Sequence, residues 1–243
     1  MKTTSTATVF HILPGMTPAV LDFFKEITGP RLDDHEAHLK RLGLTVEQAW
    51  IEPTNEGDML VFYFESPDIE KSLKGLGESN ELHDVWFREK MYTLTGADLC
   101  DYRELEPSEL LLESPQQKHR GPVGAVATVF PVLPGKLDEL RSWLADLTGP
   151  RQDDYKGYLW RYGLTRERFF LKHAEKKDMI ILHAEGDEPA SAISRFARSS
   201  HPFDAWMREE LLYLCGIDFI RRQTAPAPHL VFDWRELAEA KAA

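Results

Sequence analysis

Short apolar stretches with the two-residue period of β-strands alternate along the chain with stretches of helical period. Residues 8–13 are β-branched and apolar and end at a Pro-Gly pair, which is typical of a strand followed by a turn. Residues 48–52 and 59–65 are the second and third expected strands, and Asn55–Asp58 joins them as a hairpin. Apolar and mixed positions alternate within 59–65, so one face of this strand is wholly apolar.

Apolar residues also recur every three or four positions in four further segments, which predicts four helices. Their apolar stripes are Val20, Leu21, Phe24 and Ile27; Leu32, His35, Leu39 and Leu42; Ile69, Leu73 and Leu76; and Trp86, Phe87, Met91 and Leu94. Gly29 can end the first helix, and the second is expected to start at Pro30 and to run to Gly43. With a closing strand, the order β-α-β-β-α-β predicts a four-stranded antiparallel sheet with helices on one face.

The whole pattern occurs twice, at an offset of 120 residues. The register holds without a gap from Ala7 and Ala127 to Leu99 and Phe219, and 30 of these 93 aligned positions are identical. The repeated blocks include Ala-Thr-Val-Phe at 7 and 127, Leu-Pro-Gly at 13 and 133, Thr-Gly-Pro-Arg at 28 and 148, and Gly-Leu-Thr at 43 and 163. Chance does not produce this similarity over a gapless stretch, so we interpret the chain as one α+β unit written twice.

Two such units can hide their bare sheet faces by packing them together. We therefore expect an α+β fold in which two ferredoxin-like β-α-β-β-α-β repeats pack sheet to sheet as one pseudo-two-fold barrel. The expected parts are a first repeat at 1–113, a polar Pro/Gly-bearing linker at 114–122, a second repeat at 123–234 and a tail at 235–243.

Composition and charge exclude several classes of function. A formal net charge of -11 argues against a nucleic-acid partner and against a polybasic membrane contact. The two cysteines, Cys100 and Cys215, do not match across the repeats, so no duplicated disulfide or thiolate metal site is expected. Met1–Ser5 lacks the apolar core of a signal peptide and no apolar run reaches membrane-spanning length, so a cytoplasmic location is expected.

The element order and the duplication resemble the dimeric α+β barrel superfamily, some of whose members fuse two units in one chain. The repeated blocks, together with Pro202–Trp206, resemble a small bacterial family of that superfamily without an assigned function. The resemblance implies a cavity between sheet and helices. Relatives include cofactor-independent monooxygenases, haem-degrading enzymes, muconolactone isomerases and haem-dependent chlorite dismutases, which share no catalytic residue set, so no residue role is carried over.

Polar residues on the mixed face of the third strand are the first candidate site. Tyr63 and Glu65 lie on this face in the first repeat, and His183 and Glu185 in the second, and we expect the face to look into the barrel. Burial would move the carboxylate pKa values toward the working range of an acid–base catalyst. We thus predict Glu65, Glu185 and His183 as acid–base groups. The expected ligand contacts are His11, Tyr63, Trp50 and Phe170. The alternative is that both glutamates meet water at strand ends.

Other polar groups have simpler interpretations. His35 and His38 lie three apart on a helix, but their counterparts Tyr155 and Tyr158 cannot form the same metal site, and a half-exposed pair with Asp34 beside His38 is expected instead. Pairs four apart, Asp84 with Arg88 and Asp204 with Arg208, are interpreted as helix salt bridges, and Trp86 and Trp206 as core residues. Four charged residues of the second helix region recur in the second repeat: Arg31, Asp33, Asp34 and Arg41 match Arg151, Asp153, Asp154 and Arg161. Either ion pairs on the helix surface or an anion-binding site would explain this recurrence.

Two main functions remain open from the sequence. One is an enzyme that acts on a small, partly apolar molecule, of oxygenase or isomerase type, without a tightly bound organic cofactor or a metal. The other is a non-catalytic barrel that binds a small ligand or a partner. A third and weaker alternative is haem binding through a histidine such as His183, which a missing Soret band after haem addition would exclude.

Overall fold

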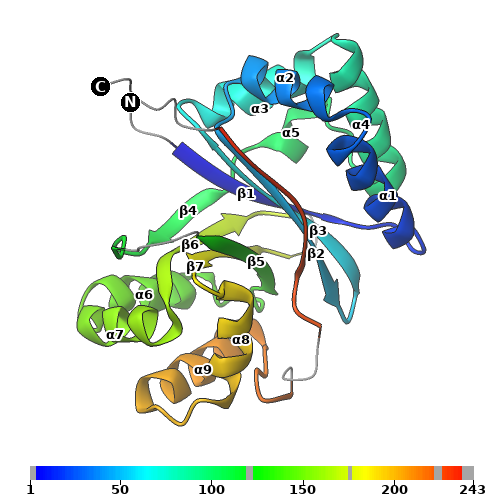
Figure 1. Cartoon of the computed structure of the whole chain (residues 1–243). Coiled ribbons are helices and arrows are strands. Elements are labelled where there is room, and N and C mark those ends of the chain that lie inside the picture. Colours follow the sequence, from blue (N-terminus) through cyan, green and yellow to red (C-terminus); the bar gives the residue numbers. More distant parts are fainter. Residues whose placement is uncertain (1–3, 119–122, 175–176, 222–225, 237–243) are drawn as a thin grey trace, which may run out of the picture. The chain divides into compact units, whose positions relative to one another are not determined.

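The computed structural model describes residues 4–118, 123–174, 177–221 and 226–236 of the 243-residue chain. The chain forms two compact units, which are described separately. Unit 1 comprises Met1–Pro107 with His229–Ala243, and unit 2 comprises Ser108–Pro228 (Figure 1). Of the expected linker 114–122, residues 119–122 lie outside the described residues, as do residues 237–243 of the expected tail.

Unit 1 combines a four-stranded antiparallel sheet with helices. Its described elements are β1 (Thr4–His11), α1 (Thr17–Thr28), α2 (Leu32–Leu42), β2 (Val46–Thr54), β3 (Gly57–Ser66), α3 (Ile69–Glu78), α4 (Leu82–Thr95), α5 (Tyr102–Leu105) and β8 (His229–Arg235). The strands follow the order β1-β3-β2-β8 (Figure 1). The expected hairpin of β2 and β3 is confirmed, since Thr54 pairs with Gly57 at its end.

Unit 2 has matching elements except for the short helix α5, which has no counterpart among its described elements. These are β4 (Glu109–Glu113), β5 (Gly124–Pro131), α6 (Leu137–Thr148), α7 (Gln152–Tyr162), β6 (Leu164–Lys172), β7 (Met179–Gly186), α8 (Pro189–Arg198) and α9 (Pro202–Cys215). The strand order is β4-β6-β7-β5. The α+β class with two antiparallel sheets is therefore confirmed. Most elements of unit 2 start 120 residues after their counterparts in unit 1, for example α1 and α6.

The closing strands are exchanged between the units. β4 follows the unit 1 elements in the chain but pairs with β6, and β8 follows the unit 2 elements but pairs with β2. The expectation that each closing strand completes the sheet of its own repeat is wrong. The sequence repeats 1–113 and 123–234 consequently differ from the compact units, because each unit contains the last strand of the other repeat.

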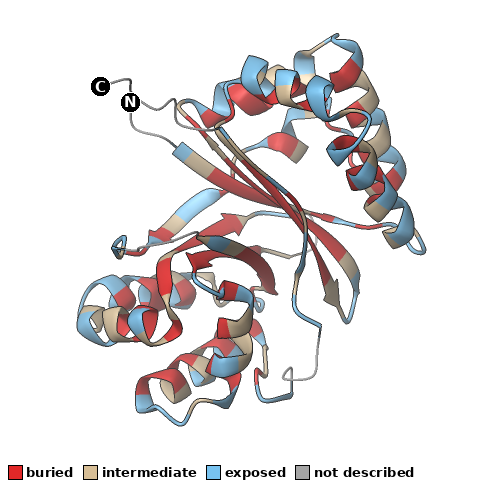
Figure 2. Ribbon diagram, in the orientation of Figure 1, coloured by how far each residue is buried: buried red, intermediate tan, exposed pale blue. Residues whose placement is uncertain are grey.

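Helices cover one face of each sheet, as the alternation in β3 predicts. Leu60, Phe62 and Phe64 belong to the apolar cluster that contains Val20 and Phe24 of α1. Full burial of a side chain such as Phe24 contributes about 2–3 kcal/mol. The mixed face of β3 is buried as well: Val61 and Tyr63 have no exposed surface (Figure 2). The packing of the two sheets as one barrel stays a prediction.

Glycines in the left-handed conformation end α2 and α7, two helices whose side chains contribute to the candidate sites described below. Gly43 has φ of 72° and its N–H bonds to carbonyls of α2, and Gly163 ends α7 in the same way with φ of 65°. Such backbone angles disfavour residues with a Cβ. The predicted end of the second helix at Gly43 is confirmed, while its start lies at Leu32 rather than at Pro30.

Candidate functional site: a buried histidine cluster

The strand-face candidates of unit 1 lie where the alternation places them. Tyr63 donates a hydrogen bond to Glu65 along β3. Trp50 of β2 is opposite Val61 and shares this face, and it is fully buried. His11, by contrast, lies exposed at the end of β1 opposite Met59. The structure therefore brings Tyr63 and Glu65 together and leaves His11 at the rim of the sheet.

The strand-face candidates of unit 2 are buried. His183 and Phe170 have no exposed surface, and Glu185 is almost fully buried. The carboxylate of Glu185 is bound by Arg166 at 2.7 Å. This ion pair accounts for the burial of Glu185 without a catalytic role.

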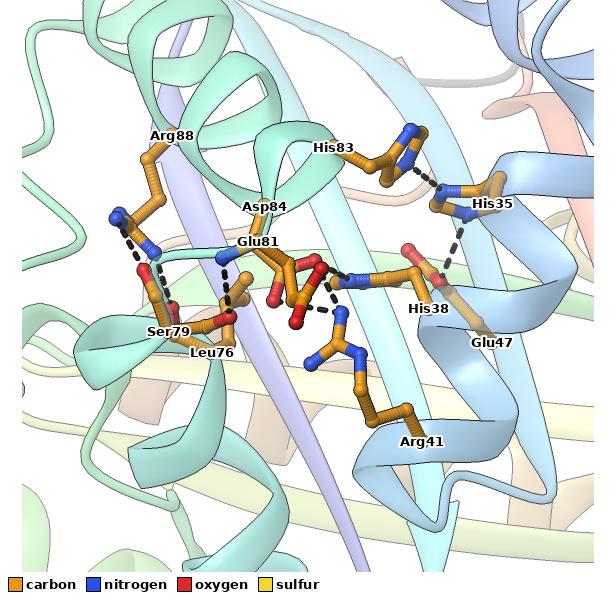
Figure 3. A network of polar contacts seen from close by, with 10 residues as sticks. All are labelled: His35, His38, Arg41, Glu47, Leu76, Ser79, Glu81, His83, Asp84 and Arg88. Carbon is orange, nitrogen blue, oxygen red and sulfur yellow. Dashed lines mark hydrogen bonds and ion pairs between the residues drawn. The ribbon is translucent and has the colours of Figure 1, made fainter.

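A second group of polar residues lies on the helix-covered face of the unit 1 sheet, and we call it the histidine cluster: His35, His38, His83, Glu47 and Asp84. Its histidine ring centroids are 5.2–5.3 Å apart. α2 supplies His35 and His38, β2 supplies Glu47, and the start of α4 supplies His83 and Asp84 (Figure 3). Every member is buried. The expectation that His35 and His38 are half exposed is wrong, because α4 and β2 enclose that side of α2.

Two chains of contacts connect the histidine cluster. His35 Nδ1 lies 3.0 Å from His83 Nε2, and His35 Nε2 lies 3.2 Å from Glu47 Oε2. His38 Nδ1 lies 2.6 Å from Asp84 Oδ1, and Arg41 donates to both oxygens of Asp84 at 2.6 and 2.7 Å. His38 thus binds Asp84 rather than being held by a contact with Asp34.

The protonation states follow from these surroundings. Burial opposes a charge on Asp84, but hydrogen bonds from His38, Arg41 and Ser79 outweigh that cost and hold the pKa of this carboxyl well below its ordinary range. Burial lowers the pKa of His83 to about 4, and His35 and His38 act in the same direction. At neutral pH, Asp84 is therefore ionised and His83 is a neutral imidazole.

The expected salt bridges within α4 and α9 are wrong. Arg88 donates to the carbonyls of Leu76 and Ser79 at the end of α3 (Figure 3). In unit 2, Arg208 donates to the carbonyls of Phe196 and Ser199. The carbonyls at a helix end lack intrahelical donors, so they attract a guanidinium. Asp84 and Asp204 instead form ion pairs with arginines of the neighbouring helices: Asp84 with Arg41 of α2, and Asp204 with Arg161 of α7.

Unit 2 keeps the two carboxylates, as Glu167 and Asp204, but has Tyr155 and Tyr158 at the positions of His35 and His38. Together with Tyr162, the counterpart of Leu42, these residues form a group that we call the tyrosine cluster. Tyr155 and Tyr158 donate to the two oxygens of Glu167 at 2.8 and 3.2 Å. Tyr162 donates to Asp204 at 2.7 Å. Burial raises the pKa of Glu167 to about 7 although both tyrosines lower it. Burial raises the pKa of Tyr155 and Tyr158 well above the ordinary value, so they stay hydrogen-bond donors.

A surface groove lies one side chain away from the histidine cluster. It has a volume of about 460 Å³ and is lined by Thr28, Leu32 and Glu36 and by residues 230–234 of β8. Phe232 lines this groove, and its ring meets the His35 ring edge-on at 5.1 Å. The Phe232 ring therefore lies between the groove and His35.

Sequence reasoning did not predict the histidine cluster as a site, because it interpreted His35 and His38 as a half-exposed pair. The spacing of His35 and His38 was visible, but Glu47 and His83 join them only through the fold. Within the described residues, no group of three or more His, Cys, Asp or Glu side chains could hold a metal ion. Among the described helices, none is long and apolar enough to cross a membrane.

Comparisons with known proteins define the fold. A crystal structure named "putative monooxygenase" from Fusobacterium nucleatum superimposes with a TM-score of 0.50 at 8% identity, over 96% of this chain and 94% of that one. An anthrone oxidase-like protein gives 0.43 at 15% identity, over 98% and 95%, and an aldoxime dehydratase gives 0.27 at 11%, over 94% and 79%. No family model and no curated protein matches the chain. The chain therefore shares an α+β fold with the first protein.

Proposed function

We propose that this chain is a tandem duplication of one α+β unit that processes a small molecule, with the histidine cluster of unit 1 as its acid–base site. The reaction would be of oxygenase or isomerase type, without a tightly bound organic cofactor, and the buried histidines and carboxylates would serve its proton-transfer steps. The observation that carries the proposal is the burial of three histidines and two carboxylates at one place.

The tyrosine cluster of unit 2 provides the internal comparison. Burying titratable groups is costly, so the fold alone favours side chains that stay uncharged. Tyr155 and Tyr158 satisfy this requirement at the positions of His35 and His38, on the same elements. Since the fold accepts tyrosines there, histidines at these positions in unit 1 are better explained by proton transfer than by packing.

The strand-face residues are the alternative location for the site. Glu65, Glu185 and His183 would then be the acid–base groups, with Tyr63, His11, Trp50 and Phe170 as ligand contacts. The full burial of His183 and the hydrogen bond from Tyr63 to Glu65 support this alternative. The ion pair of Glu185 with Arg166 and the exposure of His11 favour the histidine cluster instead.

Ligand-observed NMR with small phenols and enolisable ketones tests the proposal. The double variant His35→Tyr/His38→Tyr copies unit 2 and should bind at least tenfold more weakly than the wild type. The matched control Tyr162→Phe, in unit 2, should bind as the wild type does. Equal binding by the double variant, or a loss seen only with His183→Ala and Glu185→Gln, would contradict the histidine-cluster site. A wild type that binds no probe would favour the non-catalytic module.

A further inference from the structure

The histidine cluster contains an ordered line of three titratable side chains. Glu47 on β2, His35 on α2 and His83 on α4 follow one another with contacts of 3.2 and 3.0 Å (Figure 3). His38 takes no part in this line, because its Nδ1 lies against Asp84. The line therefore runs from the sheet, through the first helix layer, to the start of α4.

Hydrogen-bond accounting gives this line a direction. A carboxylate only accepts hydrogen bonds, and a neutral imidazole has one donor and one acceptor nitrogen. Neither Nε2 of His35 nor Oε2 of Glu47 forms a hydrogen bond with a described residue, and these two atoms lie 3.2 Å apart. With its proton on Nε2, toward Glu47, His35 accepts at Nδ1 from Nε2 of His83. This leaves a lone pair on Nδ1 of His83, a buried atom to which no described residue forms a hydrogen bond.

We propose that Glu47, His35 and His83 form a proton relay whose accepting end is Nδ1 of His83, and that it removes a proton from a neutral ligand with an acidic O–H or C–H group. This inference rests on the proposed function and assigns the base within that site. His83 is the acceptor, His35 is the positioning residue that passes the proton on, and Glu47 is the final acceptor.

The proton transfer balances without any further reactant. The ligand loses its proton to Nδ1 of His83, the Nε2 proton of His83 moves to Nδ1 of His35, and the Nε2 proton of His35 moves to Glu47. One negative charge therefore leaves the glutamate and appears on the ligand. No oxidant or reductant takes part in this step.

The surroundings of His83 favour such a transfer over a lasting positive charge. Burial is the largest cause that opposes protonation of His83, and a proton on His35 or His38 of α2 would oppose it further, while Asp84 of α4 and Asp34 of α2 favour protonation more weakly. The positive end of the α4 dipole adds to the opposition. Because the low pKa of His83 disfavours a charge there, a proton taken at Nδ1 is passed toward Glu47.

The nearby rings and charges indicate the ligand class. The ring centroids of His83 and Trp86 are 5.2 Å apart. The rings of His35 and His38 both stack on the Phe87 ring, with centroid distances of 6.0 and 5.8 Å. Aromatic faces favour a flat, apolar ligand. The buried carboxylate of Glu47 would repel a ligand that arrives as an anion, so the relay fits a neutral, phenol-like or enolisable molecule.

Unit 2 lacks this relay, because Phe203 occupies the position that matches His83 and a tyrosine replaces each α2 histidine. Glu167 is the counterpart of Glu47 and is bound by those tyrosines. Glu167→Gln is therefore the matched control for Glu47→Gln.

Side-chain 15N NMR of the ligand-free protein tests the relay first. His83, assigned with a His83→Phe variant, should be neutral at pH 6.5 and carry its proton on Nε2. A proton on Nδ1 would overturn the relay, whatever the ligand experiments show. This measurement separates a failure of the relay from a failure of the proposed function.

A second experiment uses 4-nitrophenol, whose phenolate absorbs visible light. At a pH where the free probe is neutral, the probe bound to the wild type and to Glu167→Gln should show phenolate absorption. Glu47→Gln should bind the probe but lower its phenolate fraction at least tenfold. A bound probe that stays protonated in the wild type, or keeps its phenolate in Glu47→Gln, would refute the relay.

Discussion

Replacing Glu167 by glutamine should change how the stability of the protein depends on pH. This carboxyl is fully buried in the tyrosine cluster, and burial raises its pKa from 4.5 to about 7. Between these two values the folded state keeps a proton that the unfolded state has lost. The contribution of Glu167 to stability is therefore greatest below pH 4.5 and is lost as the pH rises through 7.

The size of the effect follows from the two pKa values. Integrating the proton linkage from pH 5 to pH 8 gives a loss of about 2.5 kcal/mol for this one group. Glutamine has nearly the same shape and no charge, so the variant should lack that loss. Relative to the wild type, Glu167→Gln should gain about 2.5 kcal/mol in free energy of unfolding between pH 5 and pH 8.

Urea denaturation at a series of pH values measures this difference directly. An exposed substitution of the same type, Glu89→Gln on α4, is the control, and its difference from the wild type should not vary with pH. Parallel stability curves for the wild type and Glu167→Gln would show that Glu167 is ionised without penalty, and the burial argument would then be wrong.

Three further substitutions test the packing and charges of unit 1. Asp84→Asn should lower the free energy of unfolding at pH 7 by about 3 kcal/mol, measured by urea denaturation, because Arg41 and His38 lose a buried carboxylate partner. This difference from the wild type should shrink only as the pH falls below 3.8, through the depressed pKa of Asp84. The wild type should lose stability as the pH falls from 6.5 toward 4, since only the unfolded state protonates His83 there, and His83→Phe should lose about 1–2 kcal/mol less. Phe232→Ala should lower the free energy of unfolding by about 3–5 kcal/mol in thermal denaturation, and it should open the groove toward His35.

The local sequence pattern was sufficient to predict the helices and strands, but not to predict which strands pair with one another. The alternation in 59–65 and the helix end at Gly43 were both readable, because each depends on residues near in sequence. The exchange of β4 and β8 was not readable. The two repeats offer similar strand edges at β2 and β6, so no residue pattern shows which edge a closing strand will choose.

The site was only half visible for the same reason. His35 and His38 stand out by their spacing, whereas Glu47 and His83 reach them from another strand and another helix. Asp84 pairs with Arg41 because the carbonyls at the end of α3 take Arg88, a competition that a helical i,i+4 rule does not contain. The difference between Phe203 and His83 in the two repeats is a signal that the sequence offered and that the sequence analysis did not use.

The position of a bound ligand tests the central claim most directly. A crystal of the protein soaked with 4-nitrophenol would show it. We predict that its hydroxyl lies within hydrogen-bond distance of Nδ1 of His83, inside unit 1. Probe density against His183 and Glu185 of β7, with the histidine cluster unchanged, would contradict the account and favour the strand-face site.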